Sequence, residues 1–210
     1  MEHLRRLLDN NRALVEKVTR NEPDFFSRRA GKQEPHFLFI GCADSRVPIE
    51  TLTGVAPGEM FVHRNIAYQV VPTDLNLLSV LQYAVEVLDV EHVIVCGHHQ
   101  CGGVKAAMGD ATHGLVEVWL AGIRESIQRH DGELSGYSDE PARFDRIVEL
   151  NVLRQVHNLA RTAIVQKAWK RGRRPLLHGL VYDLKDGLLR ELVLEVDGPD
   201  KVRALLATED

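Results

Sequence analysis

The spacing of hydrophobic residues along the chain predicts an alternation of strands and helices. Three short, almost continuously apolar runs, over residues 36–41, 59–63 and 91–96, have the pattern of buried strands. Elsewhere apolar residues recur every three or four positions, as they do in amphipathic helices. The expected helices cover residues 74–89 (opened by an Asp74 cap), 114–130, 143–171 and 198–207. Strands that alternate with helices indicate an α/β fold with a mainly parallel sheet.

The first thirty residues precede this alternation and are expected to form two helices. Residues 2–20 predict an amphipathic helix. Its apolar face would consist of Leu4, Leu7, Leu8, Leu14, Val15 and Val18. A second, short helix is expected to start from an Asn21 N-cap, with Pro23 and Asp24 in its first turn, and to end at Gly31.

The last part of the chain predicts a β-hairpin. Residues 176–184 and 188–196 alternate between apolar and polar positions around the turn sequence Lys-Asp-Gly at 185–187. Such a hairpin adds an antiparallel edge strand to the otherwise parallel sheet. Residues 131–141 are rich in glycine, serine and acidic residues, and we expect them to be the least ordered stretch.

We expect the whole chain, residues 1–210, to form a single domain. No internal repeat, low-complexity tract or long linker divides it. Within this domain we distinguish an N-terminal helical arm (1–31), an α/β core (36–196) flanked by helices, and a C-terminal helix and tail (198–210).

Composition excludes several classes of partner. The chain has 26 basic and 30 acidic residues, a net charge of −4, so it lacks the basic surface that nucleic acids or anionic membranes attract. Its apolar runs are far shorter than the roughly 20 residues of a membrane span. No secretory signal is apparent in the sequence. The three cysteines are an odd number, which argues against a disulfide framework. We therefore expect a cytoplasmic protein with reduced thiols, and no nucleic-acid or membrane partner.

Two loops carry residues that suit a metal. One covers residues 41–46 and the other residues 97–103, and each follows the carboxyl end of a predicted strand, where open α/β sheets build their sites. If the strands are neighbours, Cys42, His98 and Cys101 converge. Two thiolates and an imidazole are ligands that Zn²⁺ favours. Three protein ligands leave one position open, which is the pattern of a catalytic zinc and predicts a hydrolase or lyase reaction.

Taken singly, each of these residues has an ordinary structural explanation. Asp44 and Arg46 in the first loop match a surface ion pair, which contributes little stability. His99 is as suitable a ligand as His98 by composition, and we prefer His98 because it directly follows the strand. Cys96 lies inside the third strand and is expected to be a core residue.

The combined pattern Cys42-x-Asp44-x-Arg46 and His98-x-x-Cys101 resembles that of the β-class carbonic anhydrases. The resemblance covers roughly residues 1 to 195. Further matching segments occur in the same order: His63-Arg64-Asn65, the helix that begins at Asp74, Gly102-Gly103 and His178-Gly179-Leu180-Val181-Tyr182-Asp183. The resemblance implies a parallel sheet with an antiparallel edge strand. It also implies a homodimer or dimer of dimers whose N-terminal helices embrace the neighbouring subunit. The implied reaction is the reversible hydration of carbon dioxide to bicarbonate and a proton by zinc-bound hydroxide.

The resemblance also implies roles for individual residues. One Zn²⁺ per chain would be bound by Cys42, His98 and Cys101. Asp44 and Arg46 would form the catalytic dyad beside the metal, and Gln33 would reach into the neighbour's site to hydrogen-bond substrate oxygen. The apolar walls of the carbon dioxide pocket would be Phe61, Ile66 and Tyr83.

Some members of the family are regulated, and the resemblance extends in part to this feature. In a closed state Asp44 would be the fourth metal ligand, released when it pairs with Arg46. A bicarbonate pocket that favours the closed state would involve Arg64, Tyr182 and a tryptophan, but Phe39 stands at the tryptophan position. Phenylalanine keeps the ring and lacks the indole donor. This favours an accessible closed state and argues against an intact bicarbonate switch.

Two alternative functions share the same metal ligands. One is the hydrolysis of CS₂ or COS on the same scaffold, which would differ only in the pocket and its entry. The other is a non-catalytic, zinc-binding regulatory protein, although the presence of both Asp44 and Arg46 argues against it. No sequence feature identifies a proton shuttle among the ten histidines, His113 included.

Overall fold

A computed structural model of the chain describes residues 2–109, 114–172 and 174–206. By the density of its internal contacts the chain divides into two compact units, Met1–Glu34 and Pro35–Asp210. We describe each unit by itself.

The N-terminal unit consists of two helices, α1 (Glu2–Asn21) and α2 (Phe25–Ala30). The expected Asn21 cap is wrong, because α1 continues through Asn21 and Pro23 lies in the turn that follows. Asp24 takes the N-cap position of α2, although its side chain accepts no capping hydrogen bond, and Gly31 ends the helix as predicted. No residue of α1 is buried, and Leu4, Leu7, Leu8 and Leu14 on its apolar face are exposed.

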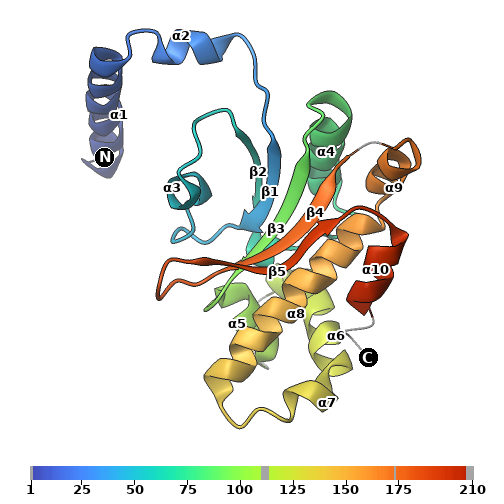
Figure 1. The fold of residues 1–210 in the computed structure, drawn as a ribbon. Helices are drawn as coiled ribbons and strands as arrows, with labels where there is room; N and C mark the ends of the chain where they lie inside the picture. Colours follow the sequence, from blue (N-terminus) through green and yellow to red (C-terminus); the bar gives the residue numbers. More distant parts are fainter. Residues whose placement is uncertain (1, 110–113, 173, 207–210) are drawn as a thin grey trace. The chain divides into compact units, whose positions relative to one another are not determined.

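The second unit is built on one five-stranded sheet (Figure 1). Its strands are β1 (Phe37–Cys42), β2 (Met60–Asn65), β3 (His92–His98), β4 (Leu176–Tyr182) and β5 (Leu189–Val196). The spatial order is β2-β1-β3-β4-β5. The first three pairings are parallel and β4 pairs with β5 antiparallel. The predicted fold class, a mainly parallel sheet with an antiparallel edge strand, is confirmed.

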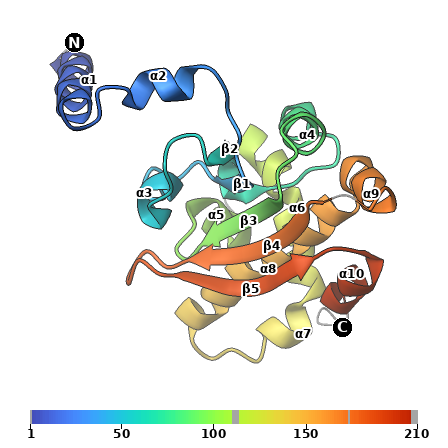
Figure 2. The same cartoon turned by 45° about the horizontal axis from the view of Figure 1, so that its top comes forward.

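One face of the sheet carries the large hydrophobic core. Leu38 and Ile40 of β1 and Val93 and Val95 of β3 point into it, as alternate residues of a strand must. The helices that contribute to this core include α4 (Leu75–Gln82), α5 (Gly102–Met108), α6 (Leu115–Arg129), α7 (Asp131–Leu134), α8 (Glu140–Ala160) and α9 (Ala163–Lys170). Figure 2 shows α5, α6 and α8 behind the sheet. Helix α10 (Pro199–Leu206) follows the last strand and packs on α8.

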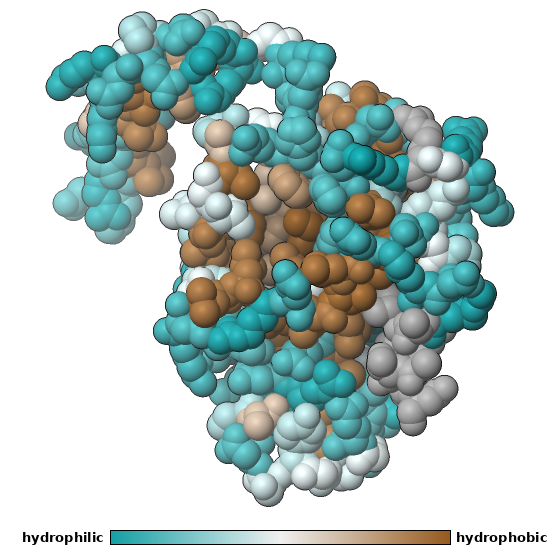
Figure 3. Space-filling model, in the orientation of Figure 1, coloured by the Kyte–Doolittle hydropathy of each residue, from teal (hydrophilic) through white to brown (hydrophobic). Residues whose placement is uncertain are grey.

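The opposite face of the sheet has a smaller core, in which Phe39, Cys96 and Tyr182 pack with Ile49 of α3 (Ile49–Thr53). Around this core lie half-buried apolar side chains of the strands and loops. These are Leu52, Met60, Val62, Ile94, Leu180, Leu184 and Leu189. The surface in Figure 3 shows an apolar area over the sheet. This face of the core unit is therefore only partly covered in the single chain.

Several helix boundaries differ from the prediction for identifiable reasons. The helix expected over 143–171 begins earlier, capped by Asp139, and is divided in two by Thr162, whose hydroxyl caps α9 by accepting from the Val165 N–H. Helices α3 and α5 are short, and glycines open α5, so periodicity did not reveal them. Helix α7 lies in the stretch expected to be least ordered. The Asp74 cap of α4 is confirmed, since its carboxylate accepts from the Asn76 N–H.

None of the described helices combines the length and apolar character needed to span a membrane.

Candidate metal centre

The three predicted metal ligands meet at the carboxyl ends of two neighbouring strands. Cys42 is the last residue of β1 and His98 the last of β3, while Cys101 lies just before α5. Because β1 and β3 are adjacent and parallel, both ends reach the same edge of the sheet. Their ligand atoms all lie within 4.8 Å of one another, and all three residues are buried. The described part of the chain thus brings together a Cys/His/Cys cluster able to bind a metal.

The orientation of His98 fits a metal ligand. Its Nδ1 lies 3.1 Å from the carbonyl oxygen of His99, so this nitrogen carries the proton and donates. The other ring nitrogen, Nε2, then keeps its lone pair. It is buried and has no hydrogen-bond partner among the described residues. A buried acceptor without a partner is unfavourable, and a cation at this position would satisfy it.

The two sulfur atoms also fit a cation. Cys42 Sγ and Cys101 Sγ lie 4.0 Å apart, close to the about 3.8 Å expected for two thiolates bound tetrahedrally at about 2.3 Å. A hydrogen bond from Cys101 lowers the pKa of Cys42. The pKa of Cys101 is raised, because it donates to Cys42 and because a second negative charge would sit beside the first. A divalent cation would supply the positive charge that lets both sulfurs ionise.

Asp44 stands beside the cluster, held by Arg46. Its Oδ2 lies 3.8 Å from His98 Nε2. The Arg46 side chain donates to both carboxylate oxygens, at 2.9 and 2.7 Å, and its backbone N–H donates to Oδ1 at 2.9 Å. These hydrogen bonds, together with the positive charge of Arg46, hold the pKa of Asp44 well below its usual range. A carboxylate that is ionised at neutral pH therefore faces the Nε2 of His98.

The residues proposed for a bicarbonate pocket occupy three different strands. Arg64 on β2 donates from Nε to the carbonyl of Cys42 at 2.7 Å and from Nη2 to the carbonyl of Asp44 at 2.6 Å. It thereby holds the loop after β1 in place. Phe39 and Tyr182 share the smaller core. The Tyr182 carbonyl also accepts from the backbone N–H of the residue after His98, at 2.9 Å.

The expected substrate-pocket residues fall into three places. Ile66 lies beside the metal loops, because a Cβ built on Gly103 would come within 3.0 Å of its Cγ2. Phe61 and Tyr83 pack on each other, with ring centroids 6.0 Å apart. Phe61 lies four residues before the β2 residue that pairs with Cys42, roughly 13 Å along the strand. Gln33 belongs to the N-terminal unit.

His99, the alternative ligand, has different surroundings from His98. Its Nε2 lies 3.9 Å from Glu149 and its Nδ1 lies 3.6 Å from Asp183. The Glu149 carboxylate is the largest cause of the raised pKa of His99. Neither carboxylate was predicted as part of the site. They come from α8 and from the end of β4, and only the folded chain brings them here. His113 lies outside the described residues.

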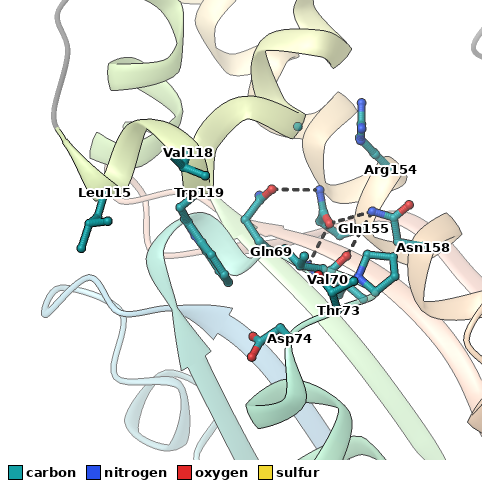
Figure 4. Close-up of a pocket in the computed structure, with 13 residues that line it drawn as sticks. Gln69, Val70, Thr73, Asp74, Leu115, Val118, Trp119, Arg154, Gln155 and Asn158 are labelled. Carbon is teal, nitrogen blue, oxygen red and sulfur yellow. Dashed lines mark hydrogen bonds between the residues drawn. The ribbon is translucent and has the colours of Figure 1, made fainter.

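A polar network that the sequence analysis did not anticipate lies at the base of another cavity, of about 540 Å³ (Figure 4). Val70 donates its N–H to Gln155 Oε1 at 2.8 Å, and Asn158 donates to the Val70 carbonyl at 3.1 Å. Gln69 donates to Asn151 at 3.2 Å. Amide side chains at positions 151, 155 and 158 follow the helical period, which was a usable signal. The metal ligands do not line this cavity.

Comparison with known proteins agrees with the geometry. The family model of carbonic anhydrases matches residues 37–189. A carbonic anhydrase of Emericella nidulans is 44% identical over 194 residues, which cover 92% of this chain and 85% of the relative. One of Pseudomonas aeruginosa is 37% identical over 173 residues, covering 80% and 77%.

Solved structures agree as well. A Coccomyxa β-carbonic anhydrase in complex with acetazolamide superposes with a TM-score of 0.90 at 40% identity, covering 94% of this chain and 90% of the other. A chain from tetrameric β-carbonic anhydrases of Sordaria macrospora gives 0.87 at 38% identity, covering 91% and 98%. From its sequence, its sheet and its buried Cys/His/Cys cluster, the chain belongs to the β-class carbonic anhydrase family.

Proposed function

We propose that the protein catalyses the zinc-dependent, reversible hydration of carbon dioxide to bicarbonate and a proton. The observation that carries this proposal is the buried cluster of Cys42, His98 and Cys101 with Asp44 beside it, in a chain of this family. Bound Zn²⁺ would supply a positive charge that lowers the pKa of a water molecule to about 7, at the one position that three protein ligands leave open.

Asp44 is the proposed catalytic carboxylate. Its ionised form accepts a hydrogen bond from the attacking water and directs the lone pair of that water toward the carbon of the substrate. Arg46 keeps Asp44 ionised and fixes both of its oxygens. In this arrangement the carboxylate is engaged by Arg46. In the proposed closed state Asp44 would leave Arg46 and become the fourth metal ligand. Its Oδ2 lies 3.8 Å from Nε2 of the ligand His98.

Gln33, Phe61, Ile66 and Tyr83 are the proposed substrate residues. Carbon dioxide is neutral and apolar overall, so apolar side chains suit its pocket, and the Gln33 amide can donate to the oxygen on which negative charge develops. Ile66 lies beside the metal loops of its own chain. We propose that Gln33 and the Phe61–Tyr83 pair act across a subunit interface.

We further propose a homodimer, or a dimer of dimers, in which the N-terminal arm packs on a second copy. Two exposed apolar surfaces support it. The leucine face of α1 has no buried residue, and the smaller core leaves one face of the sheet partly uncovered. Burying both removes apolar surface from water. The Sordaria proteins similar to this chain are tetrameric.

Regulation by bicarbonate is proposed to be weak in this protein. Arg64 holds the loop of Cys42 and Asp44 through two backbone carbonyls, so an anion that drew Arg64 away would loosen that loop. Phe39 has no donor to help hold such an anion. We expect bicarbonate to inhibit Phe39→Trp more strongly than the natural chain.

The decisive experiment measures zinc per chain together with the rate of carbon dioxide hydration. Purified, reduced protein should contain about one zinc and be active, lose both on chelation, and regain both when zinc is restored. Hydrolysis of CS₂ and COS is assayed on the same samples. Activity that survives complete zinc removal, or zinc-loaded folded protein that turns over CS₂ or COS but not carbon dioxide, would overturn the proposal.

A further inference from the structure

A separate small cavity lies between α6 and α8 and is lined by basic and polar side chains. Its volume is about 150 Å³. The residues that line it are Ser126, Arg129, His130, Arg154, His157, Asn158 and Arg161. Three guanidinium groups and two imidazoles therefore surround one space, and no carboxylate is among these lining residues.

The helical period explains how these side chains come together. Ser126, Arg129 and His130 occupy positions i, i+3 and i+4 at the end of α6. The α8 side contributes positions 154, 157, 158 and 161, which also recur every three or four residues. The two helices pack on each other, so one basic stripe from each borders the cavity.

Two of the three guanidinium groups, those of Arg129 and Arg161, have no counter-charge among the described residues. Arg154 pairs with Glu125 at 3.1 Å, but Glu125 is 65% exposed. No carboxylate of the described residues lies within 4.0 Å of the side-chain nitrogens of Arg129 or Arg161. His130 is 5% exposed, and its Nδ1 donates to the Ser126 carbonyl at 2.7 Å. Its Nε2 is buried without a partner among the described residues.

The partial negative charges at the carboxyl ends of the two helices do not balance the positive charge of this cluster. Both α6 and α8 terminate here, and a helix C-terminus favours cations because it carries roughly half a negative charge. Two such ends amount to about one negative charge. Three guanidiniums exceed it even when Glu125 is counted.

We propose that this cavity binds a phosphate-sized oxyanion. Guanidinium groups present paired N–H donors that match phosphate oxygens, and the unpartnered imidazole nitrogen of His130 supplies a further donor when protonated. The ligand is either free inorganic phosphate or the phosphate group of a small phosphomonoester. The site is independent of the metal centre, because it shares no residue with it.

The test is a calorimetric titration of the zinc-loaded full chain with inorganic phosphate and with ribose 5-phosphate, at constant ionic strength. Phosphate can also reach the metal centre, so the comparison is between the natural chain and the double variant Arg129→Gln/Arg161→Gln. Both side chains are exposed, so the fold tolerates the change. Arg171→Gln, which removes one exposed charge elsewhere, is the control for the loss of an arginine outside the cavity.

We expect phosphate to bind the natural chain and Arg171→Gln equally, and the double variant at least about tenfold more weakly, since two charge-assisted contacts are lost. Hydration of carbon dioxide without phosphate should be unchanged in all three. Binding of ribose 5-phosphate as well assigns the site to phosphomonoesters; binding of phosphate alone assigns it to the free ion. Equal phosphate affinity in the natural chain and the double variant, or no binding to either, would overturn the proposal.

Discussion

The guanidinium of Arg46 engages both carboxylate oxygens of Asp44, with Nε donating to Oδ1 at 2.9 Å and Nη2 donating to Oδ2 at 2.7 Å. The same Nη2 lies 3.4 Å from the carbonyl of Gln100, in the loop that carries His98 and Cys101. One side chain thus connects the loop after β1 to the loop after β3. The orientation of the carboxylate therefore depends on both loops.

Replacing Arg46 should slow catalysis. In Arg46→Ala the Asp44 carboxylate loses the side-chain donors that fix both of its oxygens. Its pKa rises toward the ordinary value of about 3.9, which still leaves it ionised at neutral pH, so the loss comes from orientation and not from protonation. We expect carbon dioxide hydration at neutral pH to fall by about 10²-fold, measured by stopped-flow assays. Arg171→Ala, an exposed arginine elsewhere, should leave the rate unchanged.

Asp44→Asn should separate catalysis from metal binding. The amide keeps the shape of the side chain and removes its charge, so it no longer orients the attacking water as a carboxylate does. Hydration should fall by about 10²–10⁴-fold, while the zinc content stays at one per chain because Asp44 is not among the three clustered ligands. A fully active variant would contradict the role of Asp44.

The neighbouring histidines should differ in their effect on metal content. His98→Gln removes a ligand, so zinc and thermal stability should both fall, since metal binding contributes to folding free energy. His99→Gln is the matched control, because the His99 side chain faces Glu149 and Asp183. It should retain zinc. Elemental analysis measures the zinc content and thermal melts measure the stability of both variants. Loss of zinc in His99→Gln with retention in His98→Gln would make His99 the ligand.

Gly97→Ala should destabilise the protein through overpacking. A Cβ at this position would lie 2.6 Å from Val152 Cγ2 and 2.9 Å from Tyr68 Cζ, both in the large core. We expect a loss of about 1–3 kcal/mol in the free energy of unfolding, measured by urea titration. Gly132→Ala, where a Cβ meets nothing within 4 Å, should cost little. Trimming the neighbour with Val152→Ala should restore part of the loss in a Gly97→Ala background.

Cys96 should make the protein less stable in alkali. Burial raises the pKa of its thiol from 9.0 to about 12, so above pH 9 the unfolded chain loses this proton before the folded one does. The stabilising contribution is complete below pH 9 and is lost as the pH rises toward 12, at about 1.4 kcal/mol per pH unit. Unfolding of Cys96→Ala should depend less steeply on pH between 9 and 11. Identical slopes in the natural chain and in Cys96→Ala would show that the Cys96 thiol does not contribute to the pH dependence of stability.

The fold and the metal cluster were predictable because their signals are local. Each ligand loop directly follows an apolar run, and parallel neighbouring strands bring such loops together. The division between α8 and α9 was missed because the helical spacing of apolar residues continues through Thr162, which caps α9. The Phe61–Tyr83 contact and the basic cavity between α6 and α8 depend on packing between distant segments, which periodicity within one segment does not encode.

The 59-residue separation between Cys42 and Cys101 has a consequence for biosynthesis. The growing polypeptide carries Cys42 early. The other two ligands, His98 and Cys101, are synthesised only at the end of β3 and just after it. The cation therefore cannot be captured with its full set of ligands until that strand has joined the first, so metal loading reports on correct strand pairing in the nascent protein.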